Sequence, residues 1–474
     1  MIDVEPVAAD GAPYDEAQSA DPVARGAYDA VLAALGGVDR AALRDDVAAR
    51  LHAAGVRFGG DDGWPFVVDP VPRIFSAGEW ARLAAGLEQR VRALDAFVRD
   101  AYGERIAVAE GIVTDAEIEG TEGYEAMLQG RWPSGTPALG VSGLDIVRDT
   151  DGTLLVLEDN LRTPSGTSYS AAARRAVTDA LRAAGITVPH IRAIGPAYVE
   201  LLGAARRAAA PAGVDEPQAV VLTDGPASVA YYEHARLARA LNIPLVTLGQ
   251  LERDRAGGLR RRLPGGRNAP VDVIYRRTDS DLVHTPDGAL TMVAAALVEP
   301  WLEGRVGIVN GFGTGVADDK LIHGAVEELV RLFLGEEPLL RSVPTLKLGD
   351  PDALEQVLDD PRAYVIKARY GEGGKGVTVC RDVADDTLAA LLADVRADPG
   401  AWIAQRVVAL STHPTVTQDG TLEPRHVDLR PYIFFTEDGP RAAPGGLTRV
   451  ALRRGSLVVN SSQQGGAKDT WVLE

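Results

Sequence analysis

The sequence predicts an α/β protein with helices near its amino end and a mostly parallel sheet in its middle. Residues 25–58 and 77–119 carry apolar residues at the spacing of helices that bury one face. Residues 219–222 and 271–275 are short apolar runs typical of strands, and residues 228–240 between them have helical spacing. Strands that alternate with helices in this way favour parallel pairing, because the helix carries the chain back to the starting edge of the sheet.

The other segments complete this outline in chain order. Residues 1–24 are acidic and rich in Pro and Ala without periodic spacing, which predicts a disordered tail. Residues 59–72 are rich in Gly, Asp and Pro and are expected to separate the two helical segments. Residues 251–270 are rich in Arg and Gly and are predicted to be a solvated connector. Helical spacing returns at 168–184 and 195–209, a strand is expected at 245–248, and a helix followed by β-rich segments is expected from 315 onward.

The composition narrows the class of protein. At 474 residues the chain can form two or three domains, and its 46% hydrophobic content supplies their cores. A formal net charge of −18 argues against a basic surface for nucleic acid or anionic membranes. The start shows no secretion signal and no apolar run is long enough for a membrane span, so a cytoplasmic location is expected. The single cysteine, Cys380, excludes a disulfide framework and a thiolate metal cluster.

A glycine-rich loop between two apolar runs is the strongest indication of nucleotide binding. Lys367 lies near the end of the first run, and Val377 begins the second. Glycines let the backbone approach a phosphate closely and turn its N–H groups toward it, and the lysine adds a positive charge at the base of the loop. The glycines are Gly371, Gly373, Gly374 and Gly376.

Other known glycine loops fit this segment less well. The loop also spells G-x-G-x-x-G, but dinucleotide-binding folds need a helix after it, and the β-branched residues that follow favour a strand. A protein kinase has its lysine after the loop, and a Walker loop needs a Gly-Lys-Ser/Thr ending, which is absent. An ordinary glycine-rich hairpin turn is the alternative that the residues leave open.

A second pattern near residue 150 predicts a hairpin with acidic residues on one face. Two apolar runs flank the turn-forming segment Asp149–Gly152. A register that pairs Arg148 with Thr153 places Asp145 opposite Val156 and makes Glu158 its diagonal neighbour. Because side chains alternate along strands, the residues expected on one face are Asp145, Val156, Glu158 and Asn160.

This face could bind a metal ion. Two carboxylates and an amide oxygen suit Mg²⁺, which takes oxygen ligands and keeps waters and phosphate oxygens in its other positions. A solvent-exposed polar face is the alternative, because acidic residues mostly lie in water. A register slip of one residue would also move the side chains apart.

The two patterns occur among motifs that resemble the ATP-grasp superfamily, in particular its circularly permuted type 2 branch, which is related to glutathionylspermidine-synthetase-like ligases. In the ordinary order a Glu-x-Asn metal segment would follow the other motifs, whereas here it precedes them as Glu158-Asp159-Asn160. A circular permutation produces this displacement, and it is tolerated because termini often lie close together. The matching motifs, within residues 60–474, are Asp319-Lys320, Val343-Pro344-Thr345, Lys367 with the glycine loop, the hinge Trp402–Val407, Asp428-Leu429-Arg430, Gly445–Arg449 and Asn460–Gly466.

The resemblance implies a circularly permuted ATP-grasp fold of the α/β (α+β) class, with a helical N-terminal region and an α/β pre-grasp-like domain. It implies ATP and Mg²⁺, with Mn²⁺ as an alternative, as cofactors. The implied division gives residues 1–24 to the tail, 25–135 to the helical region, 136–167 to a metal-binding hairpin of the ATP-grasp core, 168–312 to an α/β substrate domain and 313–474 to the nucleotide-binding subdomains.

The resemblance also implies roles for single residues. The lysines would hold the α- and β-phosphates, the loop would close over them, and the arginines would stabilise the transferred phosphoryl group and oxyanion charge. The hinge departs from the pattern at Gln405-Arg406, where many relatives have Gln-Glu or Glu, so the ribose contact is open. The implied set is Arg430 and Arg449 for catalysis, Lys320, Lys367, the loop glycines, Gln405 and Asn460 for ATP, and Asp145, Glu158 and Asn160 for the metal.

The implied activity is an ATP-dependent carboxylate–amine (or thiol) ligase. Its partners would be small-molecule carboxylates and amines, such as amino acids, peptides or polyamines, with no nucleic acid and no membrane; homo-oligomer formation is left open. Two alternatives are an ATP-grasp phosphotransferase, for which no histidine segment recommends itself, and a non-catalytic ATP-binding or scaffold protein. Arg276-Arg277, at the end of a predicted strand, would bind a substrate carboxylate or only pair with Asp279 and Asp281.

Overall fold

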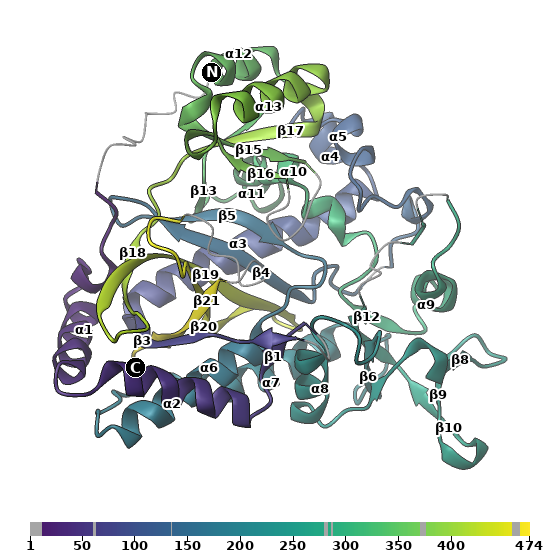
Figure 1. The fold of residues 1–474 in the computed structure, drawn as a ribbon. Coiled ribbons are helices and arrows are strands. Elements are labelled where there is room, and N and C mark those ends of the chain that lie inside the picture. Colours follow the sequence, from purple (N-terminus) through teal and green to yellow (C-terminus); the bar gives the residue numbers. More distant parts are fainter. Residues whose placement is uncertain are drawn as a thin grey trace.

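The computed structural model describes residues 12–59, 63–133, 135–278, 283–285, 288–369, 376–456 and 465–474. A twisted main sheet lies at the centre of the molecule (Figure 1). A small antiparallel sheet with two helices lies at one end of it, and a parallel sheet lies at the other end.

The main sheet joins strands from both halves of the chain. Its strand order is β13-β5-β4-β19-β20-β21-β3, and β18 also pairs with β19. The early strand β4 is therefore hydrogen-bonded to the late strand β19, with Ile146 opposite Leu429. The strands are β3 (Val68–Phe75), β4 (Val141–Arg148), β5 (Leu154–Asn160), β13 (Arg341–Ser342), β18 (Thr412–Val416), β19 (Leu422–Thr436), β20 (Gly439–Val450) and β21 (Gly466–Val472).

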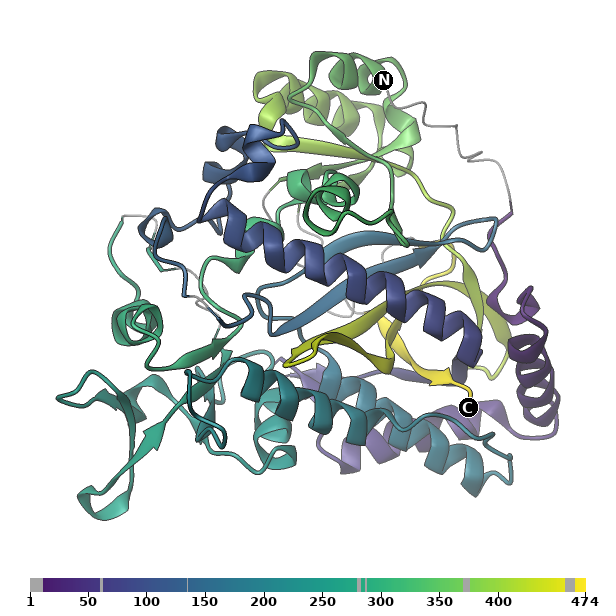
Figure 2. The same ribbon diagram turned by 180° about the vertical axis from the view of Figure 1, so that it is seen from behind.

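The long helix α3 (Ala77–Ala101) crosses one face of the main sheet (Figure 2). Ser76 caps its first turn, because its hydroxyl accepts a hydrogen bond from the backbone N–H of Glu79 at 3.1 Å. The apolar stripe of the helix belongs to one core with the residues that point from β4 and β19 toward it. That core includes Leu83, Leu87, Leu94, Phe97, Leu144, Ile146 and Leu429.

Helices also cover part of the opposite face. Val141, Tyr432 and Phe434 pack there in a second core with side chains of these helices. In Figure 1, α2, α6 and α7 lie below the sheet and α1 stands at its left edge. The rest of this face carries the polar residues of the candidate site. The helices are α1 (Pro22–Leu35), α2 (Arg40–Ala53), α6 (Thr167–Ala183) and α7 (Ile194–Ala208).

The predicted parallel α/β unit is present. Its strand order is β12-β11-β6-β7, and these pairs are parallel. Asn310 follows β12 and joins this unit to the main sheet, because its amide exchanges hydrogen bonds with the backbone of Val141 and donates to the carbonyl of Leu161. The elements are β6 (Ala219–Thr223), α8 (Tyr231–Ala240), β7 (Leu245–Val246), β11 (Val273–Arg277), α9 (Met292–Leu302) and β12 (Gly307–Val309).

The small sheet contains both strands that were predicted to flank the glycine loop. Its order is β14-β17-β15-β16 and its pairs are antiparallel. Two helices and the sheet enclose a separate small core. The elements are β14 (Thr345–Lys347), α12 (Pro351–Asp359), β15 (Tyr364–Ala368), β16 (Val377–Val379), α13 (Asp385–Ala397) and β17 (Trp402–Arg406).

Three sequence expectations are corrected by these elements. Residues 12–24 are not a disordered tail, since Glu16 is buried in the short helix η1 (Glu16–Gln18) and α1 begins at Pro22. The stretch 59–72 contains the start of β3, a strand of the main sheet, rather than only a separator. The arginine-rich connector 251–270 forms most of a sheet of its own, with β8 (Leu251–Arg253), β9 (Leu259–Arg262) and β10 (Asn268–Val271).

The remaining elements connect these units. In the described residues, no helix combines the length and the apolar character that a membrane crossing requires. The connecting elements include β1 (Arg57–Phe58), β2 (Trp64–Pro65), α4 (Ile106–Ala109), α5 (Asp115–Glu119), α10 (Lys320–His323) and α11 (Val326–Leu334).

Candidate nucleotide and metal site

The hairpin β4–β5 carries the predicted metal ligands in a register that differs from the prediction. Arg148 lies opposite Leu154, so the pairing is shifted by one residue. A β-bulge at Leu157 then changes the phase of β5, and Asp145 lies directly opposite Glu158 rather than diagonal to it. Val156 was expected on the same face but lies opposite Ile146, and both pack in the core beneath α3.

The bulge therefore places three of the four predicted side chains on one face. Asn160 lies opposite Gly143, two residues before Asp145, so it points to the same side of the sheet. Its Nδ2 is buried and has no hydrogen-bond partner among the described residues. Because an amide can be turned over within the same space, Asn160 offers this face a polar group that nothing else in the described chain uses.

Asp145 is buried and binds both candidate catalytic arginines. Arg430 donates from Nε and Nη2 to the two carboxylate oxygens at 2.7 and 2.8 Å, and Nη2 of Arg449 donates to one of them at 2.8 Å. Burial alone would raise the pKa of Asp145, but the two guanidinium groups lower it to about 2. Asp145 is thus ionised, and its oxygens are occupied by arginines in this structure.

Arg449 is also paired with Asp428, directly opposite it on β19. Its Nε donates to that carboxylate at 2.8 Å, and Nη2 makes a second contact with it. Burial raises the pKa of Asp428, while Arg449 opposes this effect. Asp428 and Arg430 are two residues apart on one strand, so both point toward Asp145 and fix the arginines at this face.

Two lysines from distant segments carry positive charge toward the acidic side of the hairpin, and one of them contacts it. Nζ of Lys320 lies 3.5 Å from Oε1 of Glu158, whose side chain is 33% exposed. Lys367 of β15 is 7% exposed. Burial lowers the pKa of Lys367. The negative charges of Glu158 and Asp145 oppose this effect, and the positive charge of Lys320 adds to it.

A pair of acidic residues positions Lys320 at the start of α10. The Asp319 side chain caps this helix by accepting from the N–H of Leu321 at 2.8 Å, and Nε of Arg369 donates to it at 2.7 Å. Asp318 accepts from the backbone N–H of Leu161, next to Asn160. Burial raises the pKa of Asp318 to about 6, and the charge of Glu158 adds to this effect, whereas Arg162 and the Leu161 hydrogen bond oppose it.

The hinge strand β17 is attached to the hairpin through Gln405. Its Nε2 donates to the Leu157 carbonyl at 3.3 Å and to Oγ1 of Thr345 at 3.0 Å. Its Oε1 is buried and has no partner among the described residues. The carbonyl of the bulge residue Leu157 therefore fixes the side chain of Gln405. The Oε1 atom of Gln405 remains as an acceptor at the hinge that no described residue uses.

Several predicted nucleotide contacts lie outside the described residues. These are Gly371, Gly373, Gly374 and Asn460. Gly376 is described and has a φ of 70°, a conformation that favours glycine. Its carbonyl accepts a hydrogen bond from the N–H of Ala368 at 2.9 Å, so β15 and β16 are still paired where the loop joins them.

The segment after the candidate metal ligands lies against the parallel sheet. Nη1 of Arg277 donates to the Pro164 carbonyl at 2.8 Å, and Nη2 lies 3.3 Å from Glu233. Glu233 accepts from the backbone N–H groups of Gly166 and Ser168 at 3.0 Å, which caps helix α6. The predicted alternative partners of the arginines, Asp279 and Asp281, lie outside the described residues.

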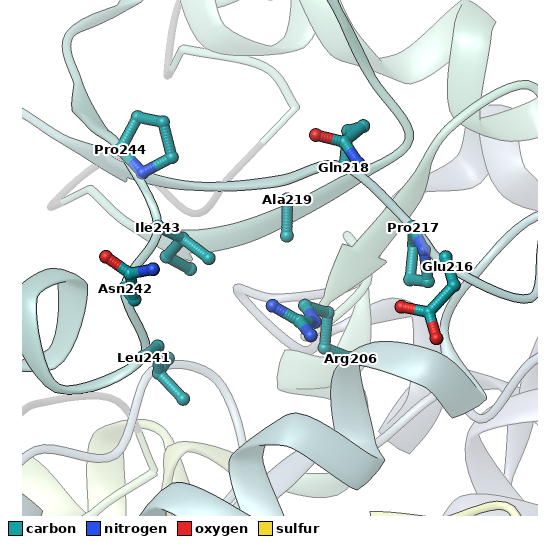
Figure 3. Close-up of a pocket in the computed structure, with 9 residues that line it drawn as sticks. All are labelled: Arg206, Glu216, Pro217, Gln218, Ala219, Leu241, Asn242, Ile243 and Pro244. Atoms are coloured by element: carbon teal, nitrogen blue, oxygen red, sulfur yellow. The ribbon is translucent and has the colours of Figure 1, made fainter.

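A surface pocket lies elsewhere, at the amino end of β6. Figure 3 shows Arg206 and Glu216 on one side of it and the segment Leu241–Pro244 on the other. Ligands of parallel sheets bind beyond the carboxyl ends of the strands, where Arg277 lies. This pocket is at the opposite edge, and we assign it no part in the candidate site.

Sequence reasoning missed the residues that support this site from behind. Asp318 was not singled out, although it precedes the Asp319-Lys320 motif. Asp159, between the candidate metal ligands Glu158 and Asn160, accepts from Arg90 and His323, which lie far away in the sequence. No local pattern marks such pairs, because each member comes from a different element.

Comparison with known proteins identifies the family. Residues 72–451 match the family described as circularly permuted ATP-grasp type 2, and the chain therefore belongs to it. The predicted fold class is confirmed. A glutathione synthetase-like effector from Globodera pallida has the same kind of fold, with a TM-score of 0.57 over 91% of this chain and 96% of the effector, at 12% identity.

Relatives of higher identity include proteins of two lengths. A Frankia alni protein named "Putative glutamate--cysteine ligase 2-3" is 42% identical over 97% of this chain and 54% of its own length. An uncharacterized protein of Mycobacterium tuberculosis is 39% identical over 97% of this chain and 84% of its own length. The chain thus spans about half the length of the first relative and most of the second.

Proposed function

We propose that this protein is an ATP-dependent ligase that joins a carboxylate to an amine. The supporting observation is the cluster of cations at the acidic hairpin: Arg430 and Arg449 bind Asp145, Lys320 lies 3.5 Å from Glu158, and the charges of Glu158 and Asp145 act on the buried Lys367 of the small sheet. A triphosphate carries several negative charges, so a site for it needs cations on more than one side. Two Frankia relatives that are named putative glutamate--cysteine ligases support the same activity.

In this proposal a carboxylate oxygen of the first substrate attacks the γ-phosphorus of ATP. The bond to the β-phosphate oxygen breaks, and ADP leaves. The amine nitrogen of the second substrate then attacks the acyl carbon, phosphate leaves, and an amide forms after loss of one proton from nitrogen. Lys320 and Lys367 would bind phosphate oxygens, and Arg430 and Arg449 would stabilise charge on the transferred group.

The residues present fit a divalent cation at the hairpin. Among the described residues there is no group of three or more His, Cys, Asp and Glu side chains that could hold a metal ion. Glu158, Asn160 and Asp145 would supply only part of the ligands of Mg²⁺. Phosphate oxygens and waters, which this ion accepts readily, would supply the others. Asp145 would have to share its oxygens with the two arginines that hold it. The ion would offset phosphate charge when bound.

The hinge and the loop complete the proposed nucleotide site. The unused Oε1 of Gln405 would accept from a nucleotide N–H, which would satisfy a buried polar atom. The glycines at 371–376 would cover the phosphates, and Asn460 would contact them. Exclusion of water by such a cover protects an acyl-phosphate from hydrolysis.

The substrate class is proposed from the relatives and from the site. The name of the Frankia relative points to amino acids, but that protein is about twice as long as the matched region. Next to Arg430, the segment 162–166 approaches Gly143 through Pro164 and is held by Arg277. This segment would line the acceptor side, with an amino acid, peptide or polyamine as the amine.

The test is turnover with Mg²⁺-ATP and pools of amino acids, peptides and polyamines, with separation of ADP, AMP and phosphate. We expect ADP and phosphate only when a carboxylate and an amine are both present. Glu158→Gln should abolish turnover with an unchanged melting temperature, and Lys367→Ala should weaken ATP binding. Glu437→Gln, in an exposed ion pair with Arg207, is the matched control that should keep full activity.

Three results would count against the proposal. ADP release without any amine would indicate an ATPase or phosphotransferase. AMP formation would indicate adenylation. Full turnover of Glu158→Gln would remove the proposed metal site.

A further inference from the structure

A buried ion pair joins the two segments that carry the candidate phosphate-binding lysines. Nε of Arg369 donates to Oδ2 of Asp319 at 2.7 Å. Asp319 directly precedes Lys320, and Arg369 lies two residues after Lys367. The side chain of Arg369 is 6% exposed and that of Asp319 is 1% exposed, so solvent screens their attraction only weakly.

Arg369 and Lys367 point to the same face of the small sheet. Arg369 directly follows β15, and its N–H donates to the carbonyl of Ala401 at 2.8 Å, so the pairing with β17 continues through this residue. Side chains alternate along a strand, and Ile366, next to Lys367, packs in the small core with α12 and α13. Lys367 and Arg369 therefore point away from that core, to the face on which Arg369 reaches Asp319.

Asp319 carries this constraint on to Lys320. Its carboxylate accepts from the N–H of Leu321 at 2.8 Å and caps α10, whose first residue is Lys320. Nζ of Lys320 lies 3.5 Å from Oε1 of Glu158 on the hairpin β4–β5. A series of direct contacts therefore leads from Arg369, on the small sheet, to the candidate metal ligand Glu158, on the main sheet.

Further hydrogen bonds fix the orientation of the Arg369 guanidinium. Nη2 donates to Oγ1 of Thr121 at 2.9 Å and to the carbonyl of Glu117, in α5. A lysine could replace the charge of Arg369 but not this set of bonds, because an ammonium lacks the planar fork of donors. Arg369 is therefore suited to hold the segments around it at a fixed spacing.

We propose that Arg369 and Asp319 are positioning residues that set the spacing between Lys320 and Lys367. A fixed spacing lets both ammonium groups bind oxygens of one triphosphate at the same time, because the two segments need not be ordered against each other when the nucleotide binds. The inference rests on the proposed function, in which these lysines bind ATP, and it assigns a role to two residues that the proposed reaction does not use.

The test compares a triphosphate with the nucleoside alone, which has no phosphate for the lysines to bind. Affinities for a non-hydrolysable ATP analogue with Mg²⁺ and for adenosine are measured by calorimetry at a temperature at which each variant is folded. Arg369→Lys keeps a positive charge and loses the fork, whereas Asp319→Asn keeps a helix-capping side chain and loses the charge. We expect each variant to bind the ATP analogue about tenfold more weakly, the loss expected for one hydrogen bond to a charged group, and adenosine as tightly as the wild type.

Substitution of the lysines connects this effect to their position. Lys320→Ala and Lys367→Ala should each weaken binding of the ATP analogue, and each should weaken it by a smaller factor in Arg369→Lys, where the lysines are already out of place. Arg73→Lys is the matched control. Arg73 is also buried and bonded to a carboxylate, that of Glu16, but it lies on β3, at the edge of the main sheet opposite β13. Its affinities for both ligands should equal those of the wild type.

The outcomes separate this inference from the proposed function. Normal affinity of Arg369→Lys and Asp319→Asn for the ATP analogue, beside weakened lysine variants, would overturn the positioning role and leave the proposed function standing. Equal losses for the ATP analogue and adenosine would also overturn it, because the ion pair would then hold the small sheet as a whole. Normal affinity of both lysine variants would overturn the role of the lysines in the proposed function, and with it the role of Arg369 and Asp319.

Discussion

Asp145 and Asp159 are buried carboxylates that point to opposite faces of the same hairpin. Asp145 accepts from Arg430 and Arg449, and Asp159 accepts from Arg90 and His323. Because a buried charge is unfavourable unless it is paired, each carboxylate also fixes the orientation of its partners. The candidate catalytic arginines are therefore positioned by the residue that sequence analysis considered only as a metal ligand.

The Asp159 network should contribute strongly to stability. Asp159→Asn removes the charge that compensates Arg90, which is 2% exposed, and leaves a buried guanidinium without its counter-ion. We expect the free energy of unfolding to fall by about 3 to 5 kcal/mol, measured by urea denaturation at pH 7. Asp46→Asn, which breaks an exposed pair with Arg50, is the matched control and should change it by less than about 1 kcal/mol. A similar small effect in both variants would contradict the prediction.

Within the candidate site, sequence patterns predicted the residues that belong to motifs. They missed the residues from other elements that hold the hairpin in place. Glu158, Asn160 and Lys367 stand in recognisable local patterns. Arg90 and His323 do not, since an arginine on a helix usually reaches solvent. Only the fold determines that these two meet Asp159, because the three residues come from separate elements.

At the scale of elements, the hairpin β4–β5 shows where strand alternation stops being informative. The apolar runs correctly predicted two paired strands, but the register depends on a bulge at Leu157 that no turn residue marks. The Leu157 carbonyl accepts from Gln405, so the bulge also connects the hairpin to the hinge strand. A feature set by contact with another element cannot be predicted from the hairpin's own sequence.

The turn into helix α6 should be intolerant of a side chain at Gly166. Its φ is +128°, and a Cβ there would lie 1.8 Å from the hydroxyl of Tyr432. We expect Gly166→Ala to lower the unfolding free energy well beyond the roughly 1 kcal/mol typical of backbone strain alone, measured by urea denaturation. Addition of Tyr432→Phe, which removes that hydroxyl, should recover part of the loss.

Gly185 provides the comparison for this prediction. Its φ is +76°, but nothing lies within 4 Å of the position of a Cβ. Gly185→Ala should therefore show only the backbone contribution. Equal losses for Gly166→Ala and Gly185→Ala, or no recovery with Tyr432→Phe, would show that the close approach to Tyr432 has no energetic consequence.

At the scale of the whole molecule, the order of motifs predicted what periodicity could not. Helix and strand spacing indicated an α/β protein, and the displaced Glu158–Asn160 segment led us to assign the early hairpin to the same core as the late motifs. In the structure, β4 of this hairpin pairs with the late strand β19. The strand β3 was missed because its residues, including two prolines, do not alternate in polarity. Burial on both sides removes the alternation on which strand prediction depends.

The amino-terminal segment should stabilise the molecule in a pH-dependent way. Glu16 of η1 accepts from Arg148 at 3.0 Å, from Arg73 at 2.5 Å and from the Ser411 hydroxyl at 2.7 Å, and thereby joins residues from three strands or their ends. Burial alone would raise the pKa of Glu16, but Arg148, Arg73 and Ser411 lower it from 4.5 to about 2. Its carboxylate is therefore more stable in the folded chain than in the unfolded one.

The lowered pKa of Glu16 defines the pH range in which the folded chain loses this stabilisation. Stabilisation by Glu16 is complete above its pKa in the unfolded chain, near 4.5, and disappears as the pH falls toward 2. It amounts to about 3 kcal/mol, because each unit of pKa difference between the folded and unfolded chain is worth about 1.4 kcal/mol. At pH 7, Glu16→Gln should lower the unfolding free energy by about this amount, whereas Glu437→Gln should not. In urea titrations from pH 7 to pH 2.5, the difference between wild type and Glu16→Gln should shrink only below about pH 4.5. A constant difference, or one that grows on acidification, would mean that the charge of Glu16 does not hold the segment in place.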